Sequence, residues 1–123
     1  MPKIGKADIA DVVRLEGYEG RLAQLGMYTV AFETYTAESD PSPLFKGLPG
    51  DRCQCPHWGV VLKGSVTFRT HDGDMTVGEG EAYYAPPGHL PLLHAGTEVV
   101  EFSPTEELNK TFAVIERNIA TST

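Results

Sequence analysis

The strongest constraint on the fold is a series of short β-rich segments that lie between glycine and proline corners in the centre of the chain. Met27–Thr36 consists largely of β-branched and aromatic residues, and HWGVVLKG, SVTFRT and GTEVVEFS further along have a similar composition. His71–Asp74 contains an Asp-Gly pair that suits a tight hairpin turn. Short strands at this close spacing predict an all-β protein, an antiparallel barrel or sandwich.

The two ends of the chain differ from this central part. Lys6–Gly26 is ambiguous, since DVVRLEG fits an edge strand whereas YEGRLAQLG ends on a glycine like a turn or a helix cap. Ser103–Glu106 has a capping-box pattern with serine at the N-cap and proline at the first helical position. Apolar residues then recur at helical spacing, namely Leu108, Phe112, Ile115 and Ile119. We therefore predict an N-terminal extension over residues 1–26, a barrel over 27–103, and a C-terminal helix and tail over 104–123 that packs on the barrel or on a second subunit.

Length and charge disfavour several classes of partner. The 123 residues suit one domain with a single core. The formal net charge of −7 disfavours nucleic acid, which is bound through clustered Lys and Arg. No apolar run approaches the roughly 20 residues of a membrane helix, and the first residues lack the layout of a signal peptide. These features predict a cytoplasmic protein that binds a small molecule rather than nucleic acid or membrane.

The central segments resemble a single-domain cupin over Tyr28–Phe102. The second cupin motif contains a glycine followed by a Pro-x-Gly turn, and Gly80, Pro86 and Gly88 match that spacing. The later histidine and asparagine positions of this motif hold Pro91 and Ala95. The resemblance implies a small antiparallel jelly-roll (cupin) barrel, and it implies a homodimer because small cupins often pair.

The first cupin motif, a His-x-His pair followed by a glutamate and a glycine, is matched at its end by Gly64. Counting back from Gly64 places His57 at the glutamate position and Asp51 and Cys53 at the two histidine positions. The resemblance therefore supports the fold, whereas the metal-ligand positions of the family are substituted. Cupins include binding and sensing proteins as well as enzymes, so the fold alone does not imply catalysis.

The segment RCQCPHWG places Cys53, Cys55 and His57 at alternate positions. Alternate residues of a strand point to one face, so in an unbroken strand these three and Asp51 would lie together. Pro56 complicates this arrangement because a proline cannot donate to a strand ladder and belongs at an edge or a bulge. A disulfide between residues two apart would be strained, and free thiols are the expectation in a reducing compartment.

These residue types suit a single transition metal, since thiolates and imidazoles bind zinc, copper or iron. A further ligand would come from the second motif, and His71 in the hairpin turn is expected at the surface. The candidate metal ligands are thus His57, Cys53, Cys55, His89 and His94. Ordinary alternatives remain open, because free cysteines are often buried as small apolar residues and a histidine on a loop at the barrel rim is common.

Aromatic and acidic residues supply candidates for a pocket wall. Tyr83 and Tyr84 are adjacent on one strand, so one of them faces inward and the other outward. Trp58 fits a pocket wall or a packing position equally well. Glu98 and Glu101 lie three apart on the last strand and should face opposite ways, and we expect both to be solvated.

Two functions from different classes fit these residues. In the first, a metal held by His57, nearby cysteine and a second-motif histidine leaves an open position for a small molecule that the protein acts on or senses. In the second, the barrel is a metal-free binding module without catalytic activity. The Cys-x-Cys-x-His cluster favours the first function, and the substituted motif positions favour the second.

Overall fold

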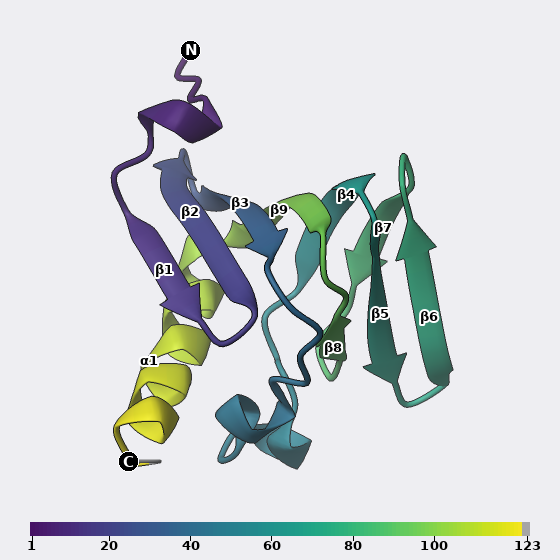
Figure 1. The fold of residues 1–123 in the computed structure, drawn as a ribbon. Coiled ribbons are helices and arrows are strands. Elements are labelled where there is room, and N and C mark those ends of the chain that lie inside the picture. The colour runs from purple at the N-terminus through teal and green to yellow at the C-terminus, as the bar shows by residue number, and fades with distance from the viewer. Residues whose placement is uncertain (122–123) are drawn as a thin grey trace.

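The computed structural model describes residues 1–121, which form two antiparallel sheets and one long C-terminal helix (Figure 1). In chain order the elements, with η for a short 3-10 helix, are η1 (Lys6–Asp8), β1 (Val12–Leu15), β2 (Tyr18–Leu25), β3 (Tyr28–Tyr35), η2 (Ser42–Phe45), η3 (Pro49–Asp51), β4 (His57–Lys63), β5 (Ser65–Thr70), β6 (Gly73–Gly78), β7 (Ala82–Ala85), β8 (Leu90–Leu93), β9 (Thr97–Pro104) and α1 (Thr105–Thr121). None of the helices within residues 1–121 is both long and apolar enough to cross a bilayer.

The larger sheet has six strands in the order β1-β2-β3-β9-β4-β7, and the smaller sheet has three in the order β6-β5-β8. Every neighbouring pair is antiparallel. The ambiguity near the N-terminus resolves into strands, because β1 and β2 form successive hairpins that extend the sheet beyond β3. Side chains from both sheets meet in one core, which includes Val61, Val99, Val66 and Phe68.

Strand alternation decides which side chains of the larger sheet face this core. On β4 the odd-numbered His57 and Val61 are buried, whereas Trp58, Val60 and Leu62 are exposed. The same alternation holds on β7 and β9, which pair with β4 on either side. Odd-numbered residues of these three strands therefore form the inner face of the sheet.

The predicted all-β architecture is confirmed, including the hairpin at His71–Asp74, where Gly73 adopts a φ of 113°. One strand was not predicted. β8 contains Pro91, which usually argues against a strand. The proline is tolerated because β8 lies at the edge of the three-stranded sheet and pairs on one side with β5.

The C-terminal helix begins at Thr105, one residue later than the capping pattern predicts. Ser103 belongs to β9, and its hydroxyl lies 2.6 Å from Nδ1 of His57 rather than serving as the helix cap that we predicted. Leu108 and Ile115 are buried on the predicted apolar face of α1. The helix lies beside η2 and under the larger sheet (Figure 1), where it covers one side of the interior.

Candidate functional site

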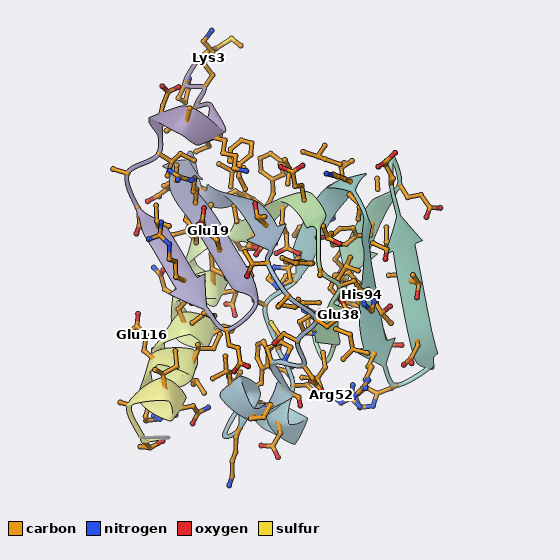
Figure 2. The ribbon with its side chains drawn as sticks, in the orientation of Figure 1. Lys3, Glu19, Glu38, Arg52, His94 and Glu116 are labelled. Carbon is orange, nitrogen blue, oxygen red and sulfur yellow. The ribbon has the colours of Figure 1, made fainter. Side chains whose placement is uncertain are left out.

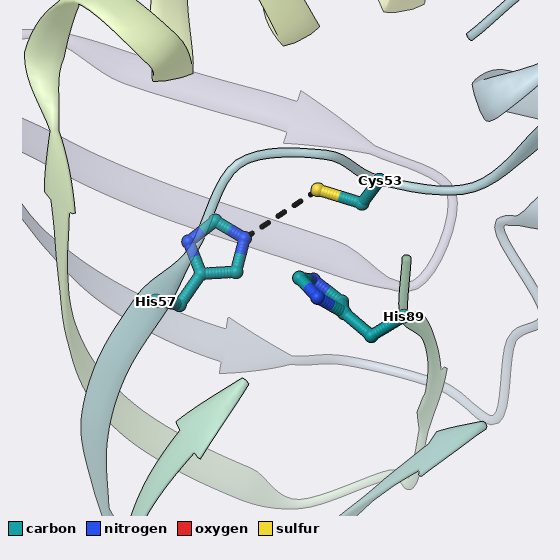
Figure 3. A group of neighbouring side chains, drawn as sticks. All are labelled: Cys53, His57 and His89. Carbon is teal, nitrogen blue, oxygen red and sulfur yellow. Dashed lines mark hydrogen bonds between the residues drawn. The ribbon is translucent and has the colours of Figure 1, made fainter. Parts of the chain in front are cut away.

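Three potential metal ligands converge in the interior from separate parts of the chain. Cys53 lies in the segment before β4, His57 is the first residue of β4, and His89 immediately precedes β8. One ligand atom from each side chain lies within 4.8 Å of the others, and all three residues are buried (Figure 3). Cys53 Sγ lies 3.6 Å from Nε2 of His57, and the two imidazole rings have centroids 5.0 Å apart. We call Cys53, His57 and His89 the Cys-His-His group.

Backbone pairing brings Cys53 to His89 across 36 residues of sequence. The Cys53 N–H donates to the carbonyl of His89 at 3.0 Å, and the Gly88 N–H donates to the carbonyl of Cys53 at 2.8 Å. Gly88 has a φ of 94°, a conformation that favours glycine. The Arg52 guanidinium also donates to the carbonyl of Gly88. The PPGH turn thus positions His89 through main-chain bonds to the Cys53 segment.

Hydrogen bonds to the Nδ1 atoms orient both histidines. Nδ1 of His89 lies 2.6 Å from the carbonyl oxygen of Pro86, which only accepts, so this nitrogen carries the proton. Nδ1 of His57 lies 2.6 Å from Oγ of Ser103 and 3.8 Å from a carboxylate oxygen of Glu101. A proton on Nδ1 satisfies this arrangement too. Both rings then present the lone pair of Nε2, the arrangement seen in metal-ligating histidines.

Burial sets the protonation of the Cys-His-His group. It lowers the pKa of His57 to about 4, and with the neighbouring charge of His57 it lowers that of His89 to about 4. Both imidazoles are therefore neutral near pH 7. Burial also raises the pKa of Cys53 to about 12, so the thiol is protonated when no metal is bound. Binding of a metal by the thiolate would release that proton.

Two buried carboxyl groups lie beside the Cys-His-His group. Glu33 on β3 and Glu101 on β9 are neighbours in the interior, and burial is the main reason that the pKa of each is raised. The negative charge of Glu101 raises the pKa of Glu33 further and favours the protonated form of Glu33. The Tyr18 hydroxyl donates to Glu33 Oε2, and the Tyr83 hydroxyl donates to Glu101 Oε1 at 2.7 Å.

A cavity of about 110 Å³ joins the carboxyl pair to the Cys-His-His group. Its walls come from both sheets, from the η2 segment and from α1, and most of them are apolar. Leu44 and Phe45 of η2 and Phe112 and Ile115 of α1 belong to this apolar wall. The arrangement combines a metal-type donor set, a buried acid pair and a cavity with largely apolar walls.

Two of the five predicted ligands lie apart from this group. Cys55 is buried as a free thiol among apolar side chains, with burial raising its pKa to about 12. His94 follows β8, with its ring 2.9 Å from the Thr67 hydroxyl and 3.3 Å from a Glu38 carboxylate oxygen (Figure 2). The chain is not an unbroken strand before β4, so the predicted common face does not form. Asp51 accordingly lies exposed in η3.

The predicted pocket wall needs correction. Trp58 and Tyr84 lie on the outer face of the larger sheet, where their rings contact each other at 5.0 Å, because both occupy even-numbered positions of paired strands. Tyr83 faces inward and bonds Glu101. His71 is exposed, as predicted.

The expectation that Glu98 and Glu101 are both solvated is wrong for Glu101. Alternation on β9 sends Glu98 outward and Glu101 into the core. Glu33 was missed altogether. Its signal in the sequence is the only charged residue of this strand, placed between the buried Ala31 and Tyr35 on the same face.

Solved structures with a similar fold were found at low sequence identity. An RmlC-like cupin from Shewanella frigidimarina NCIMB 400 superposes with a TM-score of 0.53 at 10% identity, covering 76% of this chain and 83% of that chain. The chain has the cupin fold. Ectoine synthase from P. lautus has a TM-score of 0.60 at 11% identity, over 85% of this chain and 78% of that one. The polyketide cyclase RemF from Streptomyces resistomycificus has a TM-score of 0.58 at 16% identity, over 85% and 79%.

No family model and no curated protein matches the sequence. The structural similarities, at 10 to 16% identity, therefore establish the fold of this cupin domain and leave its chemistry to be argued from its own residues.

Proposed function

We propose that this cupin domain binds one transition metal through Cys53, His57 and His89 and uses the adjoining cavity to act on or sense a small molecule. The observation that carries the proposal is the convergence of one sulfur and two imidazole nitrogens within 4.8 Å in a buried site. The hydrogen bonds at both Nδ1 atoms add support, because they leave the Nε2 lone pairs free for a metal.

The donor set fits zinc, copper or iron, which accept thiolate and imidazole ligands. Three protein ligands are the number that catalytic zinc sites use, and they leave a coordination position for water or substrate. A metal there would supply Lewis-acid or redox chemistry. The chain's own residues would hold the ligands, since Ser103 and Glu101 orient His57, while the apolar cavity wall keeps bulk water away.

The proposal is tested by elemental analysis. The protein is purified without an affinity tag and measured before and after reconstitution with Zn(II). We expect one equivalent of metal in the wild type and its loss in His57→Ala, His89→Ala and Cys53→Ser. The matched controls are Cys55→Ser and His71→Ala, which change the same residue types outside the Cys-His-His group and should keep the metal. Absence of metal in the reconstituted wild type, or equal loss in the controls, would refute this site.

A metal-free binding module is the second candidate, and one observation favours it. The 3.6 Å contact between Cys53 Sγ and Nε2 of His57 is a hydrogen bond when the thiol is protonated, so the group is satisfied without a metal. The cavity would then bind its small molecule unaided. This candidate predicts that a bound organic ligand stabilises the metal-free protein and that the reconstituted protein takes up no metal.

A further inference from the structure

We infer that the cavity selects a ring-sized organic molecule that carries no negative charge and donates a hydrogen bond, from a hydroxyl or an amine, to Glu33. The inference rests on the proposed function in one respect, because it takes the cavity beside the Cys-His-His group as the ligand pocket. Three independent features of the cavity carry it: the charge of its lining, an acceptor without a donor, and its size.

The charge of the lining opposes an anionic ligand. Glu16, Glu33 and Glu101 line the cavity, and no lysine or arginine does so within the described part of the chain. A buried carboxylate or phosphate needs a basic partner to offset its lost hydration. Such a ligand would here meet an acid pair instead, so a neutral or cationic molecule is favoured.

Glu33 offers a buried acceptor that lacks a donor. Its side chain is 92% buried, since its relative exposure is 8%. Oε2 accepts from Tyr18, whereas Oε1 accepts no hydrogen bond from the described residues. A buried polar atom left unsatisfied costs stability, and native proteins usually satisfy such atoms. A hydroxyl or amine on a ligand in the cavity would supply the missing donor.

The dimensions and walls suit a single ring. The cavity volume of about 110 Å³ approaches the roughly 150 Å³ of an apolar cavity that accommodates benzene. Phe45, Phe112 and Ile115 would cover the apolar body of the ligand, while its donor would face Glu33. Phenols and aryl or benzylic amines combine these properties, and their rings would lie between the acid pair and the Cys-His-His group.

Isothermal titration of the metal-free protein near pH 7 with four probes of equal ring size tests the inference. We expect phenol to bind about fivefold more tightly than toluene, because one net hydrogen bond contributes about 1 kcal/mol. We expect phenol to bind at least about tenfold more tightly than benzoate, since burying an unpaired charge costs more than 1.4 kcal/mol. Benzylamine is a cationic donor, whereas phenol is a neutral one. If phenol or benzylamine binds more tightly than toluene does, the inference is supported. Benzoate binding as tightly as phenol would overturn it.

Variants at Glu33 locate the donor site. Glu33→Leu should abolish the preference of phenol over toluene, whereas Glu33→Gln retains an acceptor oxygen and should preserve that preference. Glu98→Gln, on the outer side of the neighbouring strand β9, is the matched control and should bind like the wild type. If Glu33→Leu does not fold, Glu33→Ala replaces it. This variant should still bind toluene and should no longer bind phenol more tightly than toluene. A preference that survives removal of the acceptor overturns the inference.

The proposed function and this inference can fail separately. The inference alone would be overturned if the wild type binds one equivalent of zinc, His89→Ala loses it, and the metal-free protein prefers benzoate. If the protein binds no metal but still prefers phenol in a way that depends on Glu33, the metal site is refuted and this inference stands. Repeating the titration on zinc-loaded protein shows whether the metal contributes to ligand binding.

Discussion

The two faces of the six-stranded sheet have opposite character. On the inner face, His57, Glu33 and Glu101 are exposed by only 8 to 9%. On the outer face, Trp58 and Tyr84 are exposed by 41% and 48%. Antiparallel sheets usually bury their apolar face and expose their polar one. This sheet adds a few titratable groups to an inner face that is otherwise apolar, and it exposes aromatic rings on its outer face.

Burying titratable groups on the inner face lowers the stability of the fold. Burial lowers the pKa of His57 and of His89 and raises the pKa of Glu33, so it favours the uncharged form of all three side chains. Such pKa shifts lower the free energy of unfolding at a pH where the same groups would ionise in the unfolded chain. Groups with strongly shifted pKa values are concentrated at functional sites, where their chemistry is needed. On the outer face, the exposed Trp58 ring contacts the rings of Tyr28 and Tyr84.

The largest expected effect comes from two adjacent tyrosines on opposite faces. Tyr83→Ala should destabilise the fold by about 3–5 kcal/mol, because it removes a ring packed 4.9 Å from Phe68 and the hydrogen bond to Glu101. Tyr84→Ala should cost less than about 1 kcal/mol, since that ring is half exposed. Urea unfolding of both variants measures the difference, and equal losses would contradict the assignment of the two faces.

A second effect is the pH dependence contributed by the inner histidines in the metal-free protein. The pKa of His89 is about 4 when folded and 6.5 ordinarily, so the unfolded chain takes up the proton first as the pH falls. Stability should therefore fall between pH 6.5 and 4, by up to about 3 kcal/mol for this residue. His89→Gln should remove that share. The measurement is the free energy of unfolding across this range, with His71→Gln in the exposed turn as the surface control.

Glu33 should contribute a dependence of the opposite sign. Its raised pKa means that the stabilising contribution of the protonated carboxyl is complete below the ordinary value of 4.5 and is lost as the pH rises through the folded value. Glu33→Gln does not titrate, so its stability relative to the wild type should rise above pH 4.5, by at most about 1.4 kcal/mol per pH unit. Glu98→Gln is the control on β9, and a flat difference for Glu33→Gln would contradict the buried acid pair.

The smallest effect on the fold is expected from Trp58 on the outer face. The homodimer remains a prediction, and the exposed aromatic rings of this face are the surface through which we expect it to form. Trp58→Glu should convert the dimer into a monomer in sedimentation experiments while changing the unfolding free energy of the monomer by less than about 1 kcal/mol. A wild-type protein that sediments as a monomer at micromolar concentration would contradict the prediction.

Most of the central strands were predictable because they follow from local patterns. Runs of β-branched residues and corners such as Gly64 and the Asp-Gly pair are legible without tertiary information. Gly64 adopts a φ of 81° where a side chain would collide with Thr97, which explains why the first cupin motif ends on a glycine here. Local rules failed where one residue served a distant partner, as when the hydroxyl of Ser103 orients His57 instead of capping the helix.

The candidate site was predictable in part. His57 could be selected from its position in the motif, whereas Cys53 and Cys55 were not distinguished, and His89 was one of two alternatives from the second motif. Cys55, Trp58 and Tyr84 have suitable chemistry, yet alternation and the break before β4 direct them elsewhere. Glu33 and Glu101 carry no motif, because a buried carboxyl is recognised by what surrounds it rather than by its neighbours in sequence.

The sequence by itself indicated the antiparallel strands, their corners, the C-terminal helix and His57 as the leading residue of the Cys-His-His group. These features depend on backbone preferences and on the period of apolar residues, which act over a few positions. The tertiary structure alone decided between His89 and His94, since that choice depends on main-chain bonds between Cys53 and the PPGH turn. It also decided that Glu33 and Glu101 share the cavity, because the pairing of β3 with β9 joins residues far apart in the chain.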